Sequence, residues 1–124
     1  MSLLEAIGVT RRFGGLTAVN GVDFSIDEGE IVAVIGPNGA GKTTFFNCIT
    51  GVLPATSGRI LFSGRDITHE RPWNIARMGV SRTYQNIRLF GGASVLDNVR
   101  IGYHQHIRSG FWPSLFKIAS MRRE

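Results

Sequence analysis

A glycine-rich run at residues 36–44, Gly-Pro-Asn-Gly-Ala-Gly-Lys-Thr-Thr, constrains this 124-residue chain more than any other feature. It fits the pattern G-x-x-x-x-G-K-[ST]. Residues 31–35 before it form a short apolar run with a β-branched bias, as expected of a strand buried on both faces. Residues 43–50 after it contain neither Gly nor Pro and precede Gly51, a usual place for a helix to end. A strand, a glycine loop and a helix in this order present backbone N–H groups to a polyphosphate, whereas an ordinary glycine-rich surface turn needs neither flank.

Each residue type in this loop suits a nucleotide phosphate. Gly36, Gly39 and Gly41 allow positive φ and a close approach of the backbone to phosphate oxygens. The Lys42 ammonium is a compact charge with three donors, suited to bridging the outer two phosphates. The Thr43 hydroxyl stands at the helix start, where a phosphate-bound Mg²⁺ usually takes one protein oxygen. The predicted phosphate-binding residues are Gly36, Pro37, Asn38, Gly39, Ala40, Gly41, Lys42, Thr43 and Thr44.

The composition favours one modest globular domain, because 43% of the residues are hydrophobic. The longest strictly apolar run is the five residues 31–35, so we expect no direct insertion into a membrane. The N-terminus lacks the basic region and apolar core of a signal peptide, from which we expect a cytoplasmic protein. The single cysteine, Cys48, excludes an internal disulfide and is expected to pack in the core. The three histidines have no partners at metal-ligand spacing, which argues against a histidine metal site.

The net charge of +5 does not predict nucleic-acid binding. Twelve of the 14 basic residues are Arg, and they are scattered from Arg11 to Arg123 with no run longer than two. Nucleic-acid binders concentrate their charge on one face or in an arm. The scattered excess is typical of a solvated surface, and part of it could face a phosphate ligand or an acidic partner.

The rest of the chain predicts a mixed α/β core. Polar and apolar residues alternate over 22–26, the period of a half-buried strand. Ser94 and Asp97 match a capping box, so a helix is expected to begin at Ser94. Residues 115–122 have helical spacing and the chain ends inside that pattern, from which we expect a fragment. The other expected strands cover residues 4–11, 31–35, 59–63 and 80–84, and the other expected helices cover 43–50 and 72–78.

Two further features carry a resemblance to a known family. The stretch Arg-Phe-Gly-Gly-Leu-Thr-Ala-Val at residues 12–19 places Phe13 29 residues before Lys42 (42 − 13), and Gln85 follows Lys42 by 43 residues (85 − 42). Together with the phosphate loop, these features resemble the N-terminal half of an ATP-binding cassette (ABC) ATPase. The resemblance implies a P-loop NTPase fold of the α/β class with an antiparallel β subdomain. Residues 1–92 would then be the N-terminal part of the ATPase core, and 93–124 the start of the helical subdomain.

The resemblance also implies roles for individual residues. Phe13 would stack on adenine, with Ala18 lining the same wall. Gln85 would touch Mg²⁺ and the attacking water, so that Lys42 and Gln85 are the candidate catalytic residues, and Thr43 and Gln85 the candidate magnesium ligands. Taken alone, a Phe after two arginines is ordinarily a core or strand-end residue, and a Gln after a strand is ordinarily a solvated loop residue.

Residues 45–51 and 76–85 are similar to the subgroup that powers import of branched-chain amino acids. This similarity implies an ATP-binding subunit that uses ATP and Mg²⁺ and lies peripherally on the cytoplasmic face of the inner membrane. It would pair head to tail with a second ATPase subunit, identical or different, and dock on two permease subunits. The alternatives are a related ATPase for urea or lipopolysaccharide, a soluble ABC protein of translation or DNA maintenance, and a naturally short regulatory module.

Several family motifs do not occur in this sequence. An L-S-G-G-Q-like signature, an apolar strand ending in Asp-Glu and a later switch His are all missing. These parts stabilise the transition state and polarise the attacking water, so we expect this chain alone not to turn over ATP. The apolar residues Ile87, Leu89 and Phe90 could belong to the core or lie beside the groove that receives a permease helix.

Overall fold

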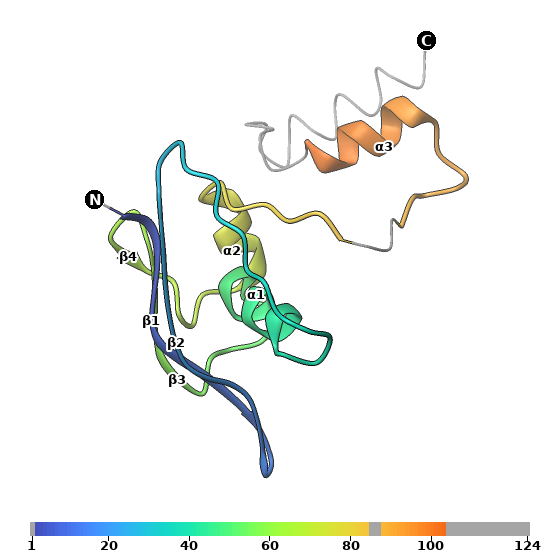
Figure 1. Ribbon diagram of the computed structural model, residues 1–124. Coiled ribbons are helices and arrows are strands. Elements are labelled where there is room, and N and C mark those ends of the chain that lie inside the picture. Colours follow the sequence, from blue (N-terminus) through green and yellow to red (C-terminus); the bar gives the residue numbers. More distant parts are fainter. Residues whose placement is uncertain (1, 85–87, 104–124) are drawn as a thin grey trace. The chain divides into compact units, whose positions relative to one another are not determined.

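The computed structural model describes residues 2–84 and 88–103, and the chain divides into two compact units (Figure 1). Unit 1 is Met1–Thr83 and unit 2 is Tyr84–Glu124. Unit 1 contains a sheet and two helices, and the described part of unit 2 contains one helix. The predicted domain boundary after residue 92 stays a prediction, and the helical pattern at 115–122 lies outside the described residues.

Unit 1 is built on a four-stranded antiparallel sheet. Its strands are β1 (Ser2–Phe13), β2 (Leu16–Asp27), β3 (Ser57–Phe62) and β4 (Arg65–Asp66), in the order β2-β1-β3-β4. These strands confirm the predictions for residues 4–11, 22–26 and most of 59–63.

The two long strands β1 and β2 form a hairpin. Phe13 pairs with Leu16 across a two-residue Gly-Gly turn, in which Gly14 has φ +56°. Turns of this length favour residues that accept positive φ, which glycine does without a steric cost. The hairpin therefore fixes Phe13 at the outer end of β1.

The three helices begin close to where the sequence predicts, and α1 and α2 also end close to their predicted ends. Helix α1 (Lys42–Thr50) follows the glycine loop and stops at Gly51, which has φ +81°. Helix α2 (Pro72–Arg77) has proline in its first turn. Helix α3 (Val95–Gly102) in unit 2 is capped by the Ser94 hydroxyl, which accepts a hydrogen bond of 3.1 Å from the Asp97 backbone N–H.

The core of unit 1 lies between the sheet and α1, and α2 packs next to α1 (Figure 1). The rings of Phe24 on β2 and Phe45 on α1 meet edge to face, with centroids 5.8 Å apart. Cys48 is 1% exposed, which confirms its prediction as a core thiol. The buried hydrophobic residues are Ala6, Val9, Val19, Phe45, Cys48, Ile49, Ala55, Ile60, Ile67 and Ile75.

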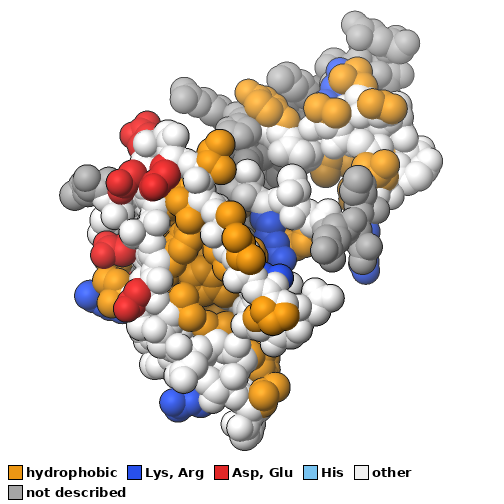
Figure 2. All heavy atoms as spheres, in the orientation of Figure 1, with side chains coloured by type: hydrophobic (Ala, Val, Ile, Leu, Met, Phe, Trp, Pro, Cys, Tyr) orange, Lys and Arg blue, Asp and Glu red, His pale blue; other side chains and the backbone are white. Residues whose placement is uncertain are grey.

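Two of the expected strands do not form. Residues 31–35 run into the glycine loop without strand hydrogen bonds, and the side chains of Ile31 and Ile35 are 98% and 92% exposed. Figure 2 shows hydrophobic side chains exposed over the middle of unit 1. Residues 80–84 are also outside any strand. A strand requires neighbouring strands to pair with its backbone groups, and no described strand pairs with either segment. The predictions of a strand at residues 31–35 and at 80–84 are therefore wrong.

Candidate functional site

The glycine-rich loop joins the exposed segment 31–35 to the first turn of α1. The carbonyl of Gly41 accepts the first helical hydrogen bond, from the Phe45 N–H at 2.9 Å, and Gly41 itself has φ +91°. Gly39 has φ +87°. These left-handed conformations are ones that side chains with a Cβ rarely adopt, which explains why glycine stands at both positions.

The loop leaves a set of backbone donors unused. Ala40 N–H donates to the Pro37 carbonyl at 3.1 Å and closes a turn within the loop. Across the described parts of the chain, the N–H groups of Gly39, Gly41, Lys42 and Thr43 donate to no other group. Unpaired N–H groups at a helix N-terminus attract an anion through both hydrogen bonding and the helix dipole.

The two side chains that begin α1 add a cation and a hydroxyl. The Lys42 ammonium donates to the Gly36 carbonyl, which folds the side chain back over the loop. Thr43 is exposed, and its hydroxyl makes no hydrogen bond to the described residues. A hydroxyl in this position fits a protein ligand of a phosphate-bound Mg²⁺, and the lysine can exchange one carbonyl oxygen for phosphate oxygens.

Gly41 also brings the loop against strand β2. A Cβ at position 41 would overlap the carbonyl oxygen of Ala18 and lie 3.5 Å from Cγ2 of Val19. The structure therefore places Ala18 directly beside the start of α1. Only a residue without a side chain permits this approach of two backbones.

Phe13 lies further along the same hairpin, and its ring is accessible. Its exposed fraction is 42%, and the Arg11 guanidinium carbon lies 4.8 Å from the ring centroid. Arg11 also donates from Nη1 to the Pro54 carbonyl at 2.7 Å, which anchors this end of β1 to the segment after α1. No hydrogen bond or ring contact joins Phe13 to the glycine loop among the residues that the structure describes. Gln85, which the sequence analysis gave as a candidate catalytic residue and magnesium ligand, lies outside the described residues.

A contact between α1 and the segment before Gln85 was not predicted from the sequence. Arg82 donates from Nη1 to Oδ1 of Asn47 at 2.6 Å, and its guanidinium carbon lies 6.0 Å from the Phe46 ring centroid. The only signal in the sequence is a polar residue, Asn47, between the apolar residues Phe46 and Cys48.

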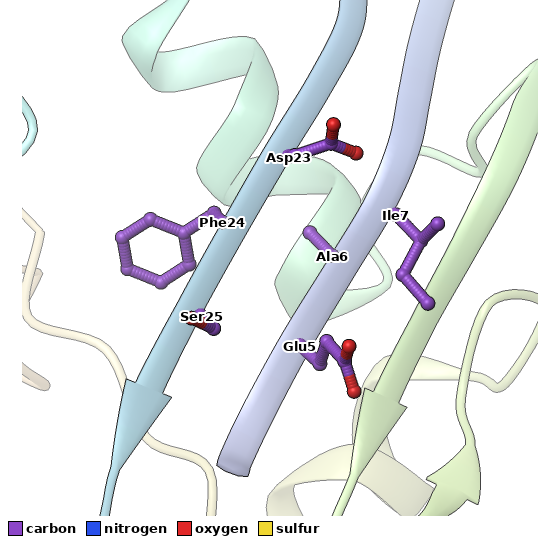
Figure 3. Close-up of a pocket in the computed structure, with 6 residues that line it drawn as sticks. All are labelled: Glu5, Ala6, Ile7, Asp23, Phe24 and Ser25. Atoms are coloured by element: carbon purple, nitrogen blue, oxygen red, sulfur yellow. The ribbon is translucent and has the colours of Figure 1, made fainter.

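A hollow of about 440 Å³ lies on the β1–β2 hairpin (Figure 3), and no residue of the glycine loop lines it. Glu5 and Asp23 line it, and Asp23 accepts a hydrogen bond of 2.7 Å from the Gly8 N–H. Two carboxylates would repel a polyphosphate, so this hollow does not suit the ligand that the loop suits. The other lining residues are Ala6, Ile7, Phe24 and Ser25.

The one thiol of the chain lies behind the site and takes no part in its chemistry. Burial raises the pKa of the Cys48 thiol above its ordinary value, and the Arg11 charge opposes that shift only in part. The neutral thiol is therefore the form that packs in the core at neutral pH.

The profile of the ABC transporter family matches residues 19–123. The chain is 47% identical over 121 residues to the high-affinity branched-chain amino acid transport ATP-binding protein BraF of Pseudomonas aeruginosa. It is 46% identical to LivG of Escherichia coli, a protein of the same description, and in both cases 98% of this chain aligns with 48% of the relative. The chain thus spans about half the length of the curated relatives it matches.

The chain is also similar in structure to solved ATP-binding cassettes of ABC transporters. The ADP conformation of the ATP-binding cassette MJ1267 matches with a TM-score of 0.77 and 36% identity, covering 94% of this chain and 46% of that one. A nucleotide-free cassette from an ABC transporter matches with a TM-score of 0.67 and 32% identity, covering 82% and 46%. Within residues 2–84 and 88–103, no helix has the length and apolar character needed to cross a membrane.

Proposed function

This chain belongs to the ABC transporter family, and we propose that it supplies the nucleotide-binding part of an ATPase subunit that powers import of branched-chain or other hydrophobic amino acids. The observation that carries the proposal is the glycine loop at the start of α1. Unpaired backbone N–H groups, the Lys42 ammonium and the Thr43 hydroxyl all belong to this loop and the first turn of α1. Few ligands other than a nucleotide polyphosphate, with its bound metal ion, use all three.

We assign each phosphate-binding group a separate task. The unused N–H groups of the loop and the first turn of α1 cradle the inner phosphates, and Lys42 turns from the Gly36 carbonyl to the outer two. Thr43 is one protein ligand of Mg²⁺, and Gln85 is the other. A Mg²⁺ ion held by these two residues would supply positive charge beside the terminal phosphates.

The adenine base of the nucleotide is proposed to bind along the β1–β2 hairpin. The exposed ring of Phe13 offers a stacking face, and Ala18 continues the wall toward the glycine loop, which it touches through Gly41. Stacking on an aromatic ring is tolerant of base identity, because every base has a π-face. The hairpin thus contributes affinity more than selectivity.

The remaining parts of the transporter are proposed from the relatives that this chain resembles, which are named as branched-chain amino acid transport ATP-binding proteins. A second ATPase subunit would pack head to tail and complete each catalytic site, and permease subunits would receive the motion. The protein would lie peripherally on the cytoplasmic face of the membrane. Because this chain has no signature motif and no Asp-Glu strand end, it should hold nucleotide without turning it over.

Replacement of the loop lysine tests the assignment. Lys42→Ala should abolish most Mg-ATP affinity, because the loop loses its one side-chain cation beside the outer phosphates. Isothermal calorimetry on the purified chain measures the effect. Arg77→Ala is the matched control, since it removes an exposed cation from the end of α2 and should leave ATP affinity unchanged. Equal ATP affinity in Lys42→Ala and the parent would refute the proposed site.

A further inference from the structure

We infer that Arg11 is a positioning residue for the proposed base-binding surface, because its guanidinium holds the Phe13 ring by one face and leaves the other face for the adenine base. The inference rests on the proposed function, and it adds a residue that contacts neither phosphate nor base. The Arg11 guanidinium carbon lies over the Phe13 ring, 4.8 Å from its centroid. A cation in this position is attracted by the electron-rich face of the ring.

The Phe13 ring has few other fixed points. Phe13 is the last residue of β1, and the turn that follows consists of Gly14 and Gly15, which have no side chains to pack against the ring. In the parts of the chain that the structure describes, no aromatic ring and no other cation contacts it. Phe13 is also 42% exposed. Without the guanidinium, the side chain would be free to exchange between rotamers, and base binding would have to select one of them.

Arg11 is itself anchored on the segment that follows α1. Its Nη1 donates a hydrogen bond of 2.7 Å to the Pro54 carbonyl. The next residue, Ala55, is buried in the core, and the hydroxyl of Thr56 accepts a hydrogen bond of 3.0 Å from the Arg12 N–H of β1. The acceptor for Arg11 is therefore tied to both the core and the strand, and the guanidinium meets the ring from a fixed place.

This arrangement leaves one donor of Arg11 unpaired. The Arg11 Nε is buried, and it has no hydrogen-bond partner among residues 2–84 and 88–103. A buried donor without a partner is unfavourable, so native structures keep one only where another interaction offsets it. The contact of the planar guanidinium with the Phe13 ring is such an interaction. Arg11 thus gives up complete hydrogen bonding for its position over the ring, as expected of a residue that serves a binding site.

A ring that is held before binding should bind the base more tightly. Ordering a free side chain costs free energy at the moment of binding, and a side chain that is already ordered avoids that cost. The hold of the glycine loop on the phosphates does not depend on this ring. Arg11 should therefore matter for nucleotides, which carry a base, and not for a bare polyphosphate.

Two ligands test this difference on the whole protein that contains this chain: Mg-ATP, and inorganic triphosphate with Mg²⁺, which has no base. Arg11→Met keeps the aliphatic stem and removes the guanidinium. Calorimetry should show that the Kd for ATP rises about three- to tenfold, while the Kd for triphosphate stays within about twofold. Retained triphosphate binding also shows that the variant is folded, because the loop must be formed to bind it.

Three further variants sharpen the test. Arg11→Lys keeps a cation and should lose less ATP affinity than Arg11→Met does. In a Phe13→Ala background, Arg11→Met should cause no further loss of ATP affinity, because the ring that it positions is already gone. Arg77→Met, which removes an exposed arginine from the end of α2, should behave as the parent with both ligands.

The possible results separate this inference from the proposed function. An unchanged Kd for ATP in Arg11→Met, or losses that multiply when it is combined with Phe13→Ala, would overturn the positioning role and leave the phosphate site standing. Equal losses for ATP and triphosphate would mean that Arg11 supports the fold or the charge of the whole site, which also overturns the role. A parent protein that binds neither ligand would overturn the proposed function and this inference with it.

Discussion

At the scale of single residues, the phosphate-binding groups follow from the sequence more directly than the base-binding groups do. Lys42 and Thr43 are fixed by the helix that starts at position 42, so their motif spacing translates directly into positions at its N-terminus. Phe13 depends on a hairpin register that the sequence pattern did not specify. The Arg82–Asn47 contact could not be predicted at all, because no periodicity links residues 35 positions apart.

Phe13 can be tested apart from the phosphate loop. Phe13→Ala should weaken ATP and ADP alike, by about 1–3 kcal/mol, because the stacking face is lost while the loop is untouched. Leu16→Ala is the matched control, since Leu16 pairs with Phe13 across the hairpin and is also exposed. Fluorescent-nucleotide titration would measure both variants. Unchanged ATP affinity in Phe13→Ala would mean that Phe13 is an ordinary strand-end residue that does not stack on the base.

At the scale of elements, the approach of α1 to β2 explains which loop glycine cannot be replaced. Gly41 and Gly29 both have positive φ, but only a Cβ at position 41 would meet another backbone, at Ala18. Strain alone should cost Gly29→Ala about 1 kcal/mol of unfolding free energy. Gly41→Ala should cost about 1–3 kcal/mol more, because either the loop or β2 must move.

Urea unfolding followed by circular dichroism would compare these two alanine variants. Since the loop also forms the proposed phosphate site, Gly41→Ala should lose ATP affinity where Gly29→Ala does not. Equal unfolding midpoints for the two variants would mean that the loop and β2 are not in contact as described.

The elements also show where sequence patterns fail. Helix boundaries were predicted well, because Gly51, Pro72 and Ser94 act locally, through left-handed φ, a fixed φ and a capping hydroxyl. The apolar run at residues 31–35 predicted a buried strand, yet Ile31 and Ile35 are exposed. Strand formation depends on partners distant in sequence, which a local pattern does not report.

At the scale of the whole molecule, the fold class followed from the motif order, whereas the proposed transported substrate rests on resemblance alone. The sheet, glycine loop and helices form an α/β arrangement like that of known ABC cassettes. No residue in this chain is expected to touch the transported molecule, because the proposed site is dedicated to nucleotide. A substrate assignment therefore needs an experiment on the whole transporter.

Deletion of the gene that encodes this chain should lower uptake of leucine, isoleucine or valine from low external concentrations and leave uptake of unrelated sugars unchanged. The expected cause is loss of the ATP-driven step, since the permease without its ATPase has no source of free energy for accumulation. Complementation with the parent gene should restore uptake, and complementation with Lys42→Ala should not, because that variant is expected to bind little ATP. Arg77→Ala serves as the complementing control. Normal amino-acid uptake together with failed urea or lipid transport would contradict the substrate and leave the nucleotide-binding proposal standing.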